Sequence, residues 1–286
     1  MYAVNQMLVC LDLSEMDEVL VKYARFFCEK AGVKKVYFVH NVKTYDLGDD
    51  FREWFGDIDL AGEVEKEINS LVKNHFGEAA EYDILVSEEP NTEVILADVV
   101  RQYKIQLTMV GRKEQLKGSG VLGTKLLRIL PCSVLVVPEL AAHKITKILV
   151  ALDFSKGSLK SLEHGRHLTE QLGVPAEVLH TYQLPSQYFP MVNETEAVKK
   201  AEKHVWDKIS ELKKKHPALD KMNFFIVRAA GKSVAERIES HLARHGNDFL
   251  ILGRKGSNPL PTLNLGSVPS ELYASANRIP LLMVYS

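Results

Sequence analysis

The sequence predicts an α/β protein built from two tandem doubly wound domains, each with a five-stranded, mainly parallel sheet. Two observations lead to this fold class. Short runs rich in Val, Ile and Leu alternate with longer stretches of helical period, which is the pattern of a parallel sheet flanked by helices. The chain of 286 residues also repeats itself once, at a spacing close to the usual length of one domain.

Three short motifs recur at a nearly constant spacing. The segment MLVCLDLSEMD returns as KILVALDFSKGS, VYFVHN returns as AEVLHT, and TMVGRK returns as LILGRK. The spacings are 141, 140 and 142 residues for the pairs Asp12 and Asp153, His40 and His180, and Gly111 and Gly253. A period of this length indicates a duplicated domain and not a solenoid of short repeats. We therefore expect one domain over residues 1–141 and another over 142–286.

The elements follow in the same order in both copies. In the first copy the patterns predict strands at 6–12, 35–41, 82–87, 106–110 and 133–137, and helices at 15–31, 61–76, 92–103 and 121–130. In the second copy they predict strands at 146–152, 176–181, 223–228, 248–252 and 281–285, and helices at 157–172, 195–215, 232–245 and 267–276. An unpaired apolar edge strand promotes aggregation, so we expect the copies to pair through Ser133–Val137 and Pro280–Val284.

Composition and charge exclude several function classes. The net charge of -1 gives no electrostatic excess for binding a nucleic acid or an anionic membrane. No apolar run approaches the length that crosses a bilayer, and the N-terminal segment lacks the basic region of a secretory signal. The three cysteines form neither a CxxC pair nor an even set, which indicates a reducing, cytoplasmic compartment.

A glycine-bearing loop follows the fourth predicted strand of the second copy. Ligands of open parallel sheets bind beyond the carboxyl ends of the strands, where this loop lies. Gly253 and Gly256 are three residues apart, and Gly266-Ser267 open the next predicted helix. Glycines allow the backbone to approach a ligand closely, and the free N–H groups of a helix start bind anions. The alternative is an ordinary glycine-bearing turn without a ligand.

The glycine loop has the spacing Gly253-x2-Gly256-x9-Gly266-Ser267. The same copy has a first strand that ends in LDFS and a last strand that is entered through Pro280. In these features the sequence resembles the universal stress protein family. The resemblance covers both copies, as in tandem members of that family. It implies a Rossmann-like fold of the adenine nucleotide alpha hydrolase type, and bound ATP, with or without magnesium. Carried over by position, it assigns the phosphates to Gly253, Gly256, Gly266, Ser267 and Val268, and the adenosine end to Ala151, Asp153 and Thr181. The family often has proline at Ala151 and valine at Thr181.

The first copy departs from this pattern. Glu114 stands where the second glycine belongs, and a carboxylate there would repel phosphate. The segment Gly118 to Gly123 matches GxGxxG in letters, but the preceding strand ends too early for a Rossmann turn. Thr124-Lys125 also reverses the order that a P-loop requires. We therefore expect the first copy to have lost ATP binding or to take another ligand.

Other candidate residues have plain structural alternatives. Asp12 and Asp153 could contact a ligand or cap the following helix. His241 and His245 have the helical spacing of two metal ligands, but the segment HLARH looks solvated and lacks further ligands, so we predict no metal site. The remaining candidates are the structural histidines His40 and His180, the strand cysteines Cys10 and Cys132, and the basic pairs Arg112-Lys113 and Arg254-Lys255, which could screen phosphate or be solvated.

Two long connections leave the expected ligand edge. One contains Trp54 and the other contains Tyr188 and Phe189, and these aromatic side chains either pack on the domain or form a lid.

The sequence thus predicts an ATP-binding or nucleotide-sensing universal stress protein with its site in the second copy. The alternatives are an interaction scaffold that binds no nucleotide, and a weak ATP hydrolase. No nucleophile and base are recognisable as a catalytic pair, so we name no catalytic residues and expect a binding module. We expect the two copies to pair within the chain, and the sequence leaves both a monomer and a homodimer of the whole chain as alternatives.

Overall fold

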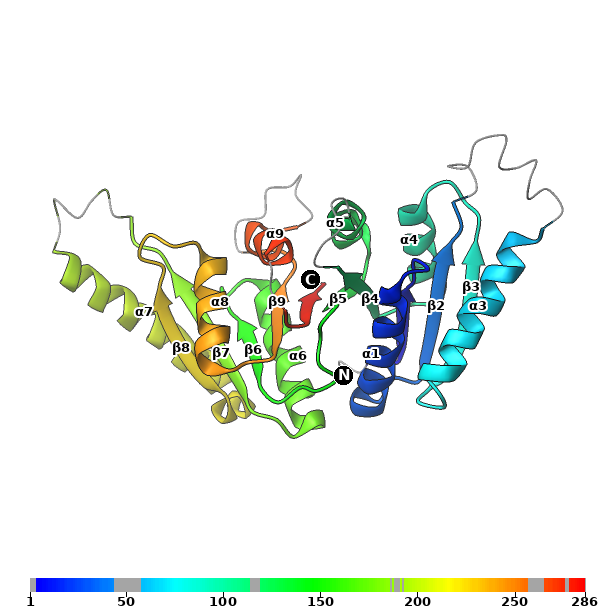
Figure 1. Ribbon diagram of the computed structural model, residues 1–286. Coiled ribbons are helices and arrows are strands. Elements are labelled where there is room, and N and C mark those ends of the chain that lie inside the picture. The colour runs from blue at the N-terminus through cyan, green and yellow to red at the C-terminus, as the bar shows by residue number, and fades with distance from the viewer. Residues whose placement is uncertain are drawn as a thin grey trace.

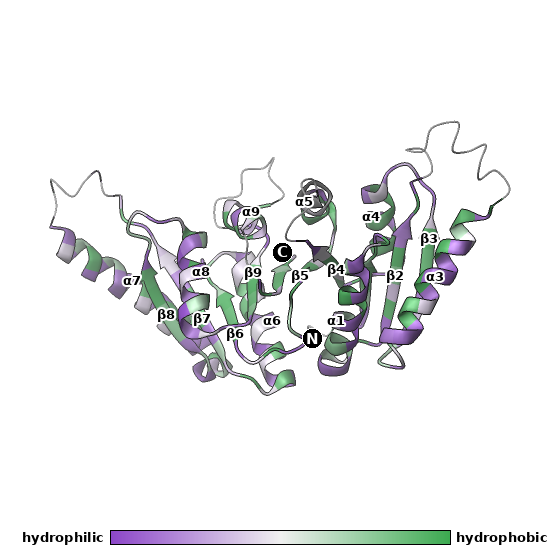
Figure 2. Cartoon of the chain, viewed as in Figure 1, coloured by the Kyte–Doolittle hydropathy of each residue, from purple (hydrophilic) through white to green (hydrophobic). Residues whose placement is uncertain are grey.

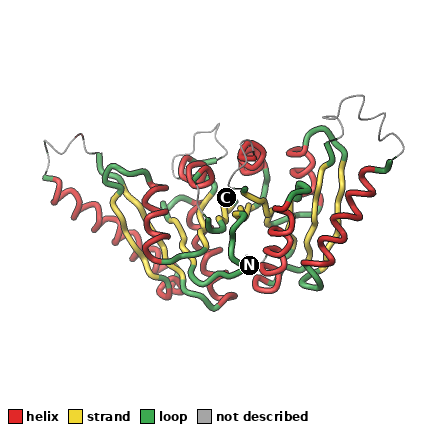
Figure 3. The backbone as a smooth tube through the Cα atoms, viewed as in Figure 1, coloured by secondary structure: helices red, strands yellow, loops and turns green. Residues whose placement is uncertain are grey.

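The computed structural model describes residues 4–43, 58–113, 119–185, 187, 191, 193–256, 265–275 and 278–285. Helices cover both faces of a central sheet (Figures 1 and 3). The strands are β1 (Gln6–Cys10), β2 (Lys35–Asn41), β3 (Glu81–Ser87), β4 (Leu107–Arg112), β5 (Ser133–Pro138), β6 (Ile148–Ala151), β7 (Ala176–Tyr182), β8 (Asn223–Arg228), β9 (Phe249–Gly253) and β10 (Leu281–Val284). The helices are α1 (Glu15–Ala31), α3 (Leu60–His75), α4 (Thr92–Gln102), α5 (Ser119–Ile129), α6 (Lys156–Leu172), α7 (Glu194–Lys215), the 3-10 helix η3 (Pro217–Lys221), α8 (Val234–His245) and α9 (Ser267–Ala274).

All ten strands belong to one continuous sheet, in the order β3-β2-β1-β4-β5-β10-β9-β6-β7-β8. We call β1 to β5 with their helices the first half, and β6 to β10 with theirs the second half. Neighbouring strands within each half are parallel, which confirms the predicted fold class. The halves join where β10 runs antiparallel to β5, with Leu282 opposite Leu135. The predicted pairing of the two copies through their last strands is therefore confirmed.

Two hydrophobic cores lie on the two faces of the sheet, and each extends across both halves. Along β1, Met7 and Val9 point into the core that α1, α3 and α6 cover, whereas Leu8 points into the core of the other face, under α4, α5, α8 and α9. This alternation is the period of a strand that is buried on both sides. Figure 2 shows the result as apolar strands between helices whose outer faces are hydrophilic.

The two halves repeat the same turn between their first strand and first helix. Ser14 caps α1 and Ser155 caps α6, each by accepting from a backbone N–H of the first turn. The residues before these caps, Leu13 and Phe154, both have positive φ angles, of 59° and 62°. Few residues other than glycine adopt this left-handed region, so the sharp turn is a feature of the fold that both copies retain.

Each half contains an arginine whose guanidinium donates hydrogen bonds to the backbone of the other half. The guanidinium of Arg112 donates to the backbone oxygens of Tyr273 and Ser275 at the end of α9, at 3.2 and 2.8 Å. The guanidinium of Arg254 donates to Leu130 O just after α5 and lies over the Tyr285 ring. Positive charge at a helix C-terminus complements its free carbonyl groups. Both proposed roles for these arginines, as phosphate screens or as solvated surface, are therefore wrong, because they hold the two halves together.

Among the described helices, none combines the length and the apolar character needed to cross a membrane.

Candidate functional site

The eight residues predicted for nucleotide binding lie around one pocket in the second half. The pocket encloses about 500 Å³ at the carboxyl ends of β6, β7 and β9, beside the N-terminus of α9. Its lining includes Ala151, Asp153, Thr181, Gly253, Gly256, Gly266, Ser267 and Val268. The sheet reverses its direction of winding between β6 and β9, and such a switch point is where open α/β sheets bind ligands.

The glycine loop closes on itself at this pocket. The N–H of Gly266 donates to the carbonyl oxygen of Arg254 at 2.9 Å, which joins the two ends of the loop. A Cβ atom added to Gly266 would lie 3.3 Å from Pro269 Cδ and 3.5 Å from the backbone N of Gly256. A side chain at residue 266 would therefore crowd Pro269 at the helix start and would touch the loop backbone at ordinary contact distance. Residues 257–264 of the loop lie outside the described part of the chain.

Gly253 lies against the backbone of the first helix of the second half. A Cβ added there would stand 2.9 Å from the carbonyl carbon of Gly157 and 3.0 Å from the backbone N of Ser158. Backbone cannot yield as a flexible side chain can, so glycine is required at residue 253. This contact brings the end of β9 close to the start of α6, at the floor of the pocket.

The start of α9 offers backbone N–H groups to an anion. Gly266 is the N-cap, and the first N–H groups of a helix have no partner within the helix. Pro269 has no N–H, which leaves those of Ser267 and Val268, both of which line the pocket. The partial positive charge of the helix start adds to them. Lys255 also lines the pocket, and its ammonium brings a further positive charge. This end of the pocket is suited to phosphate.

Asp153 and Thr181 line the same pocket, and Asp153 lies beside the glycine loop, since a Cβ added to Gly256 would stand 3.1 Å from Asp153 Oδ2. Asp153 Oδ1 accepts from the N–H of Ser155 at 2.9 Å, and Ser155, not Asp153, caps α6. The capping alternative for the two aspartates is therefore wrong, since Ser14 has the same role in the first half. The hydroxyl oxygen of Thr181 is buried and has no hydrogen-bond partner among the described residues. A buried hydroxyl without a partner is costly, and a bound ligand could supply one.

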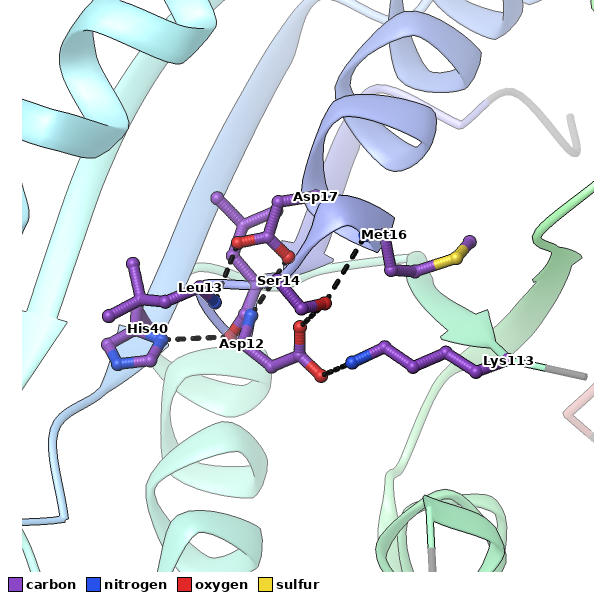
Figure 4. A network of polar contacts seen from close by, with 8 residues as sticks. Asp12, Leu13, Ser14, Met16, Asp17, His40 and Lys113 are labelled. Carbon is purple, nitrogen blue, oxygen red and sulfur yellow. Dashed lines mark hydrogen bonds and ion pairs between the residues drawn. The ribbon is translucent and has the colours of Figure 1, made fainter. Parts of the chain in front are cut away.

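The equivalent pocket of the first half encloses about 160 Å³ and is lined by Asp12, Met16, Gly111 and Lys113. Figure 4 shows Asp12, Met16 and Lys113 of this lining together with the polar contacts around them. Met16 stands at the position of Gly157 and lies so close to Gly111 that an added Cβ would meet its Cγ at 2.5 Å. Its side chain therefore lines the first-half pocket at a position where the second half has no side chain.

Polar groups of this first-half pocket bind one another. Asp17, at the position of Ser158, accepts from the N–H groups of Asp12 and Leu13 at 2.9 and 2.8 Å. Lys113 Nζ lies 2.7 Å from Asp12 Oδ2, and the hydroxyl of Ser14 donates to the other oxygen of Asp12. The carboxylate of Asp12 is thus already paired on both sides.

The pKa values of the two carboxyl groups, those of Asp17 and Asp12, are shifted in opposite directions. Burial raises the pKa of Asp17 to about 6, because the two backbone N–H groups do not make up for its lost hydration. Burial would also raise the pKa of Asp12, but the hydrogen bonds from Lys113 and Ser14 outweigh it and lower the pKa. In this network Asp12 is therefore the charged partner of Lys113.

His40 and His180 have the structural role expected of them. The Nδ1 atoms lie 3.0 Å from Leu11 O and 2.7 Å from Leu152 O, so each imidazole ties the end of its own half's first strand to the second strand. Burial lowers the pKa of both histidines. Neither interaction resembles a catalytic pair.

The cysteines are not activated. Burial raises the pKa of Cys28 to about 12 and that of Cys132 to about 11, and it raises the pKa of Cys10 as well. All three thiols are free. A reactive cysteine requires the opposite shift, so these three behave as small apolar residues.

The last glycine of the GxGxxG segment in the first half, Gly123, lies where two helices are in contact. A Cβ on Gly123 would lie 1.9 Å from the hydroxyl oxygen of Tyr273, so glycine is needed where α5 meets α9. Several other candidates lie outside the described residues, namely Glu114, Trp54, Tyr188 and Phe189.

The expectation that the segment HLARH is solvated and lacks further ligands is wrong. His241 is buried, and the carboxylate of Glu177 on β7 lies 3.0 Å from its Nε2. The sequence contains a signal that could have revealed this contact. Glu177 aligns with Tyr37 of the first copy, and a charged residue inside an otherwise apolar strand needs a partner.

Comparisons with known proteins agree with the fold. Residues 144–284 match the model of the Universal stress protein family. The solved structure of a universal stress protein from Archaeoglobus fulgidus DSM 4304 superposes with a TM-score of 0.66 and 17% identity, over 99% of this chain and 97% of that chain. A functionally unknown protein from Pseudomonas aeruginosa PAO1 gives a TM-score of 0.66 and 12% identity, over 99% and 93%. No curated protein matches the chain.

Proposed function

Because the chain belongs to the universal stress protein family, we propose that it is an ATP-binding or nucleotide-sensing protein of the stress response, with its nucleotide site in the second half. One observation carries the proposal. The eight residues assigned by the family resemblance, which are spread over more than 100 positions of the sequence, all line the same pocket of about 500 Å³. The cytoplasm and a division at residue 141 remain our predictions for location and domain boundary.

The residues that line the pocket fit the two parts of ATP, its phosphates and its adenosine. The glycine loop, the N–H groups of Ser267 and Val268, and Lys255 would hold the phosphates. The adenosine end would contact Asp153, Ala151 and Thr181. The hydroxyl of Thr181 makes no hydrogen bond with the described residues, so a polar group of the ligand would give it a partner. When bound, ATP supplies a phosphate chain whose charge the helix start can balance. The proposal assigns binding to this chain and no catalytic step.

The first half is proposed to bind no ATP. Met16 occupies part of its pocket, and Lys113 is paired with Asp12. A nucleotide would have to displace the side chain and break the ion pair. We therefore expect one ATP for each chain.

Calorimetric titration of ATP into the full chain tests this proposal. Gly266→Val should weaken binding at least about tenfold, because lost hydrogen bonds to a charged group cost about 1.5 to 3 kcal/mol each. Lys255→Gln should weaken binding as well, whereas the matched first-half variant Lys113→Gln should leave the affinity unchanged. Circular dichroism must show that each variant is folded.

Two sites of equal affinity, or undiminished affinity in folded Gly266→Val, would contradict the assignment. Absence of ATP binding by the wild type would favour the interaction scaffold. Phosphate release above a control without protein would favour the weak hydrolase.

A further inference from the structure

Towards the amino end of β7, outside the lining of the nucleotide pocket, two histidines and a glutamate meet. Glu177 is the second residue of β7, and His241 and His245 lie in the last turns of α8, which packs on β7 (Figure 1). Glu177 Oε2 lies 3.0 Å from His241 Nε2, and Glu177 Oε1 lies 3.4 Å from His245 Nδ1. Glu177 and His241 are buried, and His245 is 26% exposed.

This set has the chemistry of a transition-metal site. Two imidazole nitrogens and one carboxylate oxygen are ligands that zinc takes in proteins, and histidines four residues apart lie on one face of a helix. One ligand atom from each residue lies within 4.8 Å of the others. Ligands held about 2.0 to 2.2 Å from a tetrahedral zinc ion are roughly 3.4 Å apart. The two contacts of Glu177 already have nearly this length.

The remaining adjustment concerns the two rings. The imidazoles of His241 and His245 stack with their centroids 3.9 Å apart and their planes at 10°. Their nitrogens must converge for both to bind one ion, which requires a rotation of the partly exposed His245 ring. The same exposure leaves a fourth coordination position open to water.

The first half shows that the fold does not require these polar residues. By strand register Glu177 corresponds to Tyr37, because Leu149 and Leu8 are their partners on the neighbouring strands. His245 corresponds to Tyr103, since each precedes a residue of positive φ after its helix. Tyr37 and Tyr103 form an aromatic pair with centroids 4.4 Å apart.

Lys147 supplies positive charge to the cluster in the structure. Its Nζ lies 2.7 Å from Glu177 Oε1 and donates to the backbone oxygen of His245 at 3.0 Å. Because Lys147 binds Oε1, the oxygen Oε2 faces His241 and can serve as the metal ligand. A divalent ion next to this ammonium would be repelled by it, so Lys147 opposes metal binding.

We propose that Glu177, His241 and His245 form a binding site for a divalent transition-metal ion, with zinc as the ion that best matches the ligand set. The site belongs to the second half, and none of its three residues lines the nucleotide pocket.

Titration of zinc chloride into the chelator-treated full chain tests the site. Wild type should bind one zinc ion at the cluster, and cobalt(II) in its place should give the visible absorption of tetrahedral coordination. Removal of a residue that only hydrogen-bonds a metal ligand weakens metal binding about 10- to 100-fold, so loss of a ligand itself in Glu177→Gln should weaken zinc binding about 100-fold or more. Lys147→Gln should tighten binding, because it removes the competing charge.

Two further variants guard against misfolding and surface binding. His245→Tyr introduces the residue that the first half has at this position, and it should abolish zinc binding in a folded chain. His216→Gln removes a histidine whose Nδ1 lies 3.4 Å from Glu163 at an exposed position of the same half, and it should leave zinc binding unchanged. The proposal is wrong if wild type binds no zinc, or if Glu177→Gln and His245→Tyr bind it as wild type does.

Discussion

In the first half the backbone N–H groups of Asp12 and Leu13 donate to the carboxylate of Asp17, whereas in the second half the N–H of Asp153 donates to the hydroxyl of Ser158. Both halves keep the same left-handed turn residue, the same serine cap and the same histidine contact to the end of the first strand. The difference therefore lies in two adjacent side chains at the start of the helix, Met16-Asp17 against Gly157-Ser158.

This comparison separates the requirements of the fold from those of a ligand. The turn is retained in both halves because it directs the chain from the strand into the helix. The pocket is retained only where the residues after the cap are small. In the first half, the side chains of Met16 and Asp17 stand there, and the carboxylates of Asp12 and Asp17 have partners within the protein.

The largest expected effect comes from adding a methyl group to the glycine at or next to the end of the fourth strand of each half, Gly111 in β4 and Gly253 in β9. Gly253→Ala places a Cβ about 2.9 Å from backbone of α6, so the helix must shift and the chain should lose about 3 kcal/mol or more of stability. Gly111→Ala meets the unbranched side chain of Met16, which can change its rotamer, and should cost about 1 kcal/mol. Urea unfolding of both variants measures the difference, and equal losses would show that the two contacts are equivalent.

The second prediction concerns pH. The pKa of Asp17 rises from its usual 3.8 to about 6 on folding, so the folded state binds the proton more tightly than the unfolded state. The stabilising contribution of this group is therefore present below pH 3.8 and is lost as the pH rises through about 6. Asp17→Ser, which introduces the residue of the second half, should remove up to about 3 kcal/mol of this pH dependence.

Urea midpoints at pH 4 and pH 7 test the second prediction, with Asp98→Ser as a control because Asp98 is an exposed aspartate. The profile of Asp98→Ser should follow that of wild type. If Asp17→Ser also follows it, burial of Asp17 does not raise its pKa in the folded protein.

Local sequence patterns were sufficient to predict the elements. The strand 35–41 and the helix 15–31 have the predicted bounds, because a short apolar run, a serine cap and a terminal glycine are all encoded within a few residues. The 3-10 helix Pro217–Lys221 was not predicted, because one short turn leaves no periodic signal. The glycine loop was found because its ligand-facing residues follow a fixed spacing.

Contacts between distant segments were not predictable in the same way. Arg254 looked like a loop residue, but its partner Leu130 is 124 positions away and becomes its neighbour only when β5 pairs with β10. Likewise, Glu177 reaches His241 only because α8 lies on β7. The sequence shows which residues need a partner, and the tertiary arrangement decides which partner they receive.

The smallest expected effect distinguishes the two pockets by a single hydroxyl group. Thr181 and Asn41 occupy equivalent positions, and each has a buried oxygen that accepts no hydrogen bond from the described residues. They differ because Asn41 Nδ2 donates to Glu89 O and Thr92 Oγ1, both at 2.9 Å, whereas the hydroxyl of Thr181 makes no hydrogen bond with the described residues. Thr181→Val keeps the shape and removes the hydroxyl. Without a ligand the variant should be as stable as wild type or slightly more stable, because it no longer buries an unpaired polar group. It should bind ATP about two- to tenfold more weakly, which corresponds to the loss of one neutral hydrogen bond of about 0.5 to 1.5 kcal/mol.

Calorimetric titration of ATP and thermal unfolding without ligand, both on the same sample of Thr181→Val, measure the affinity and the stability. Lower stability without ligand together with unchanged ATP affinity would mean that the hydroxyl serves the fold, and that the adenosine end of the pocket has another polar contact.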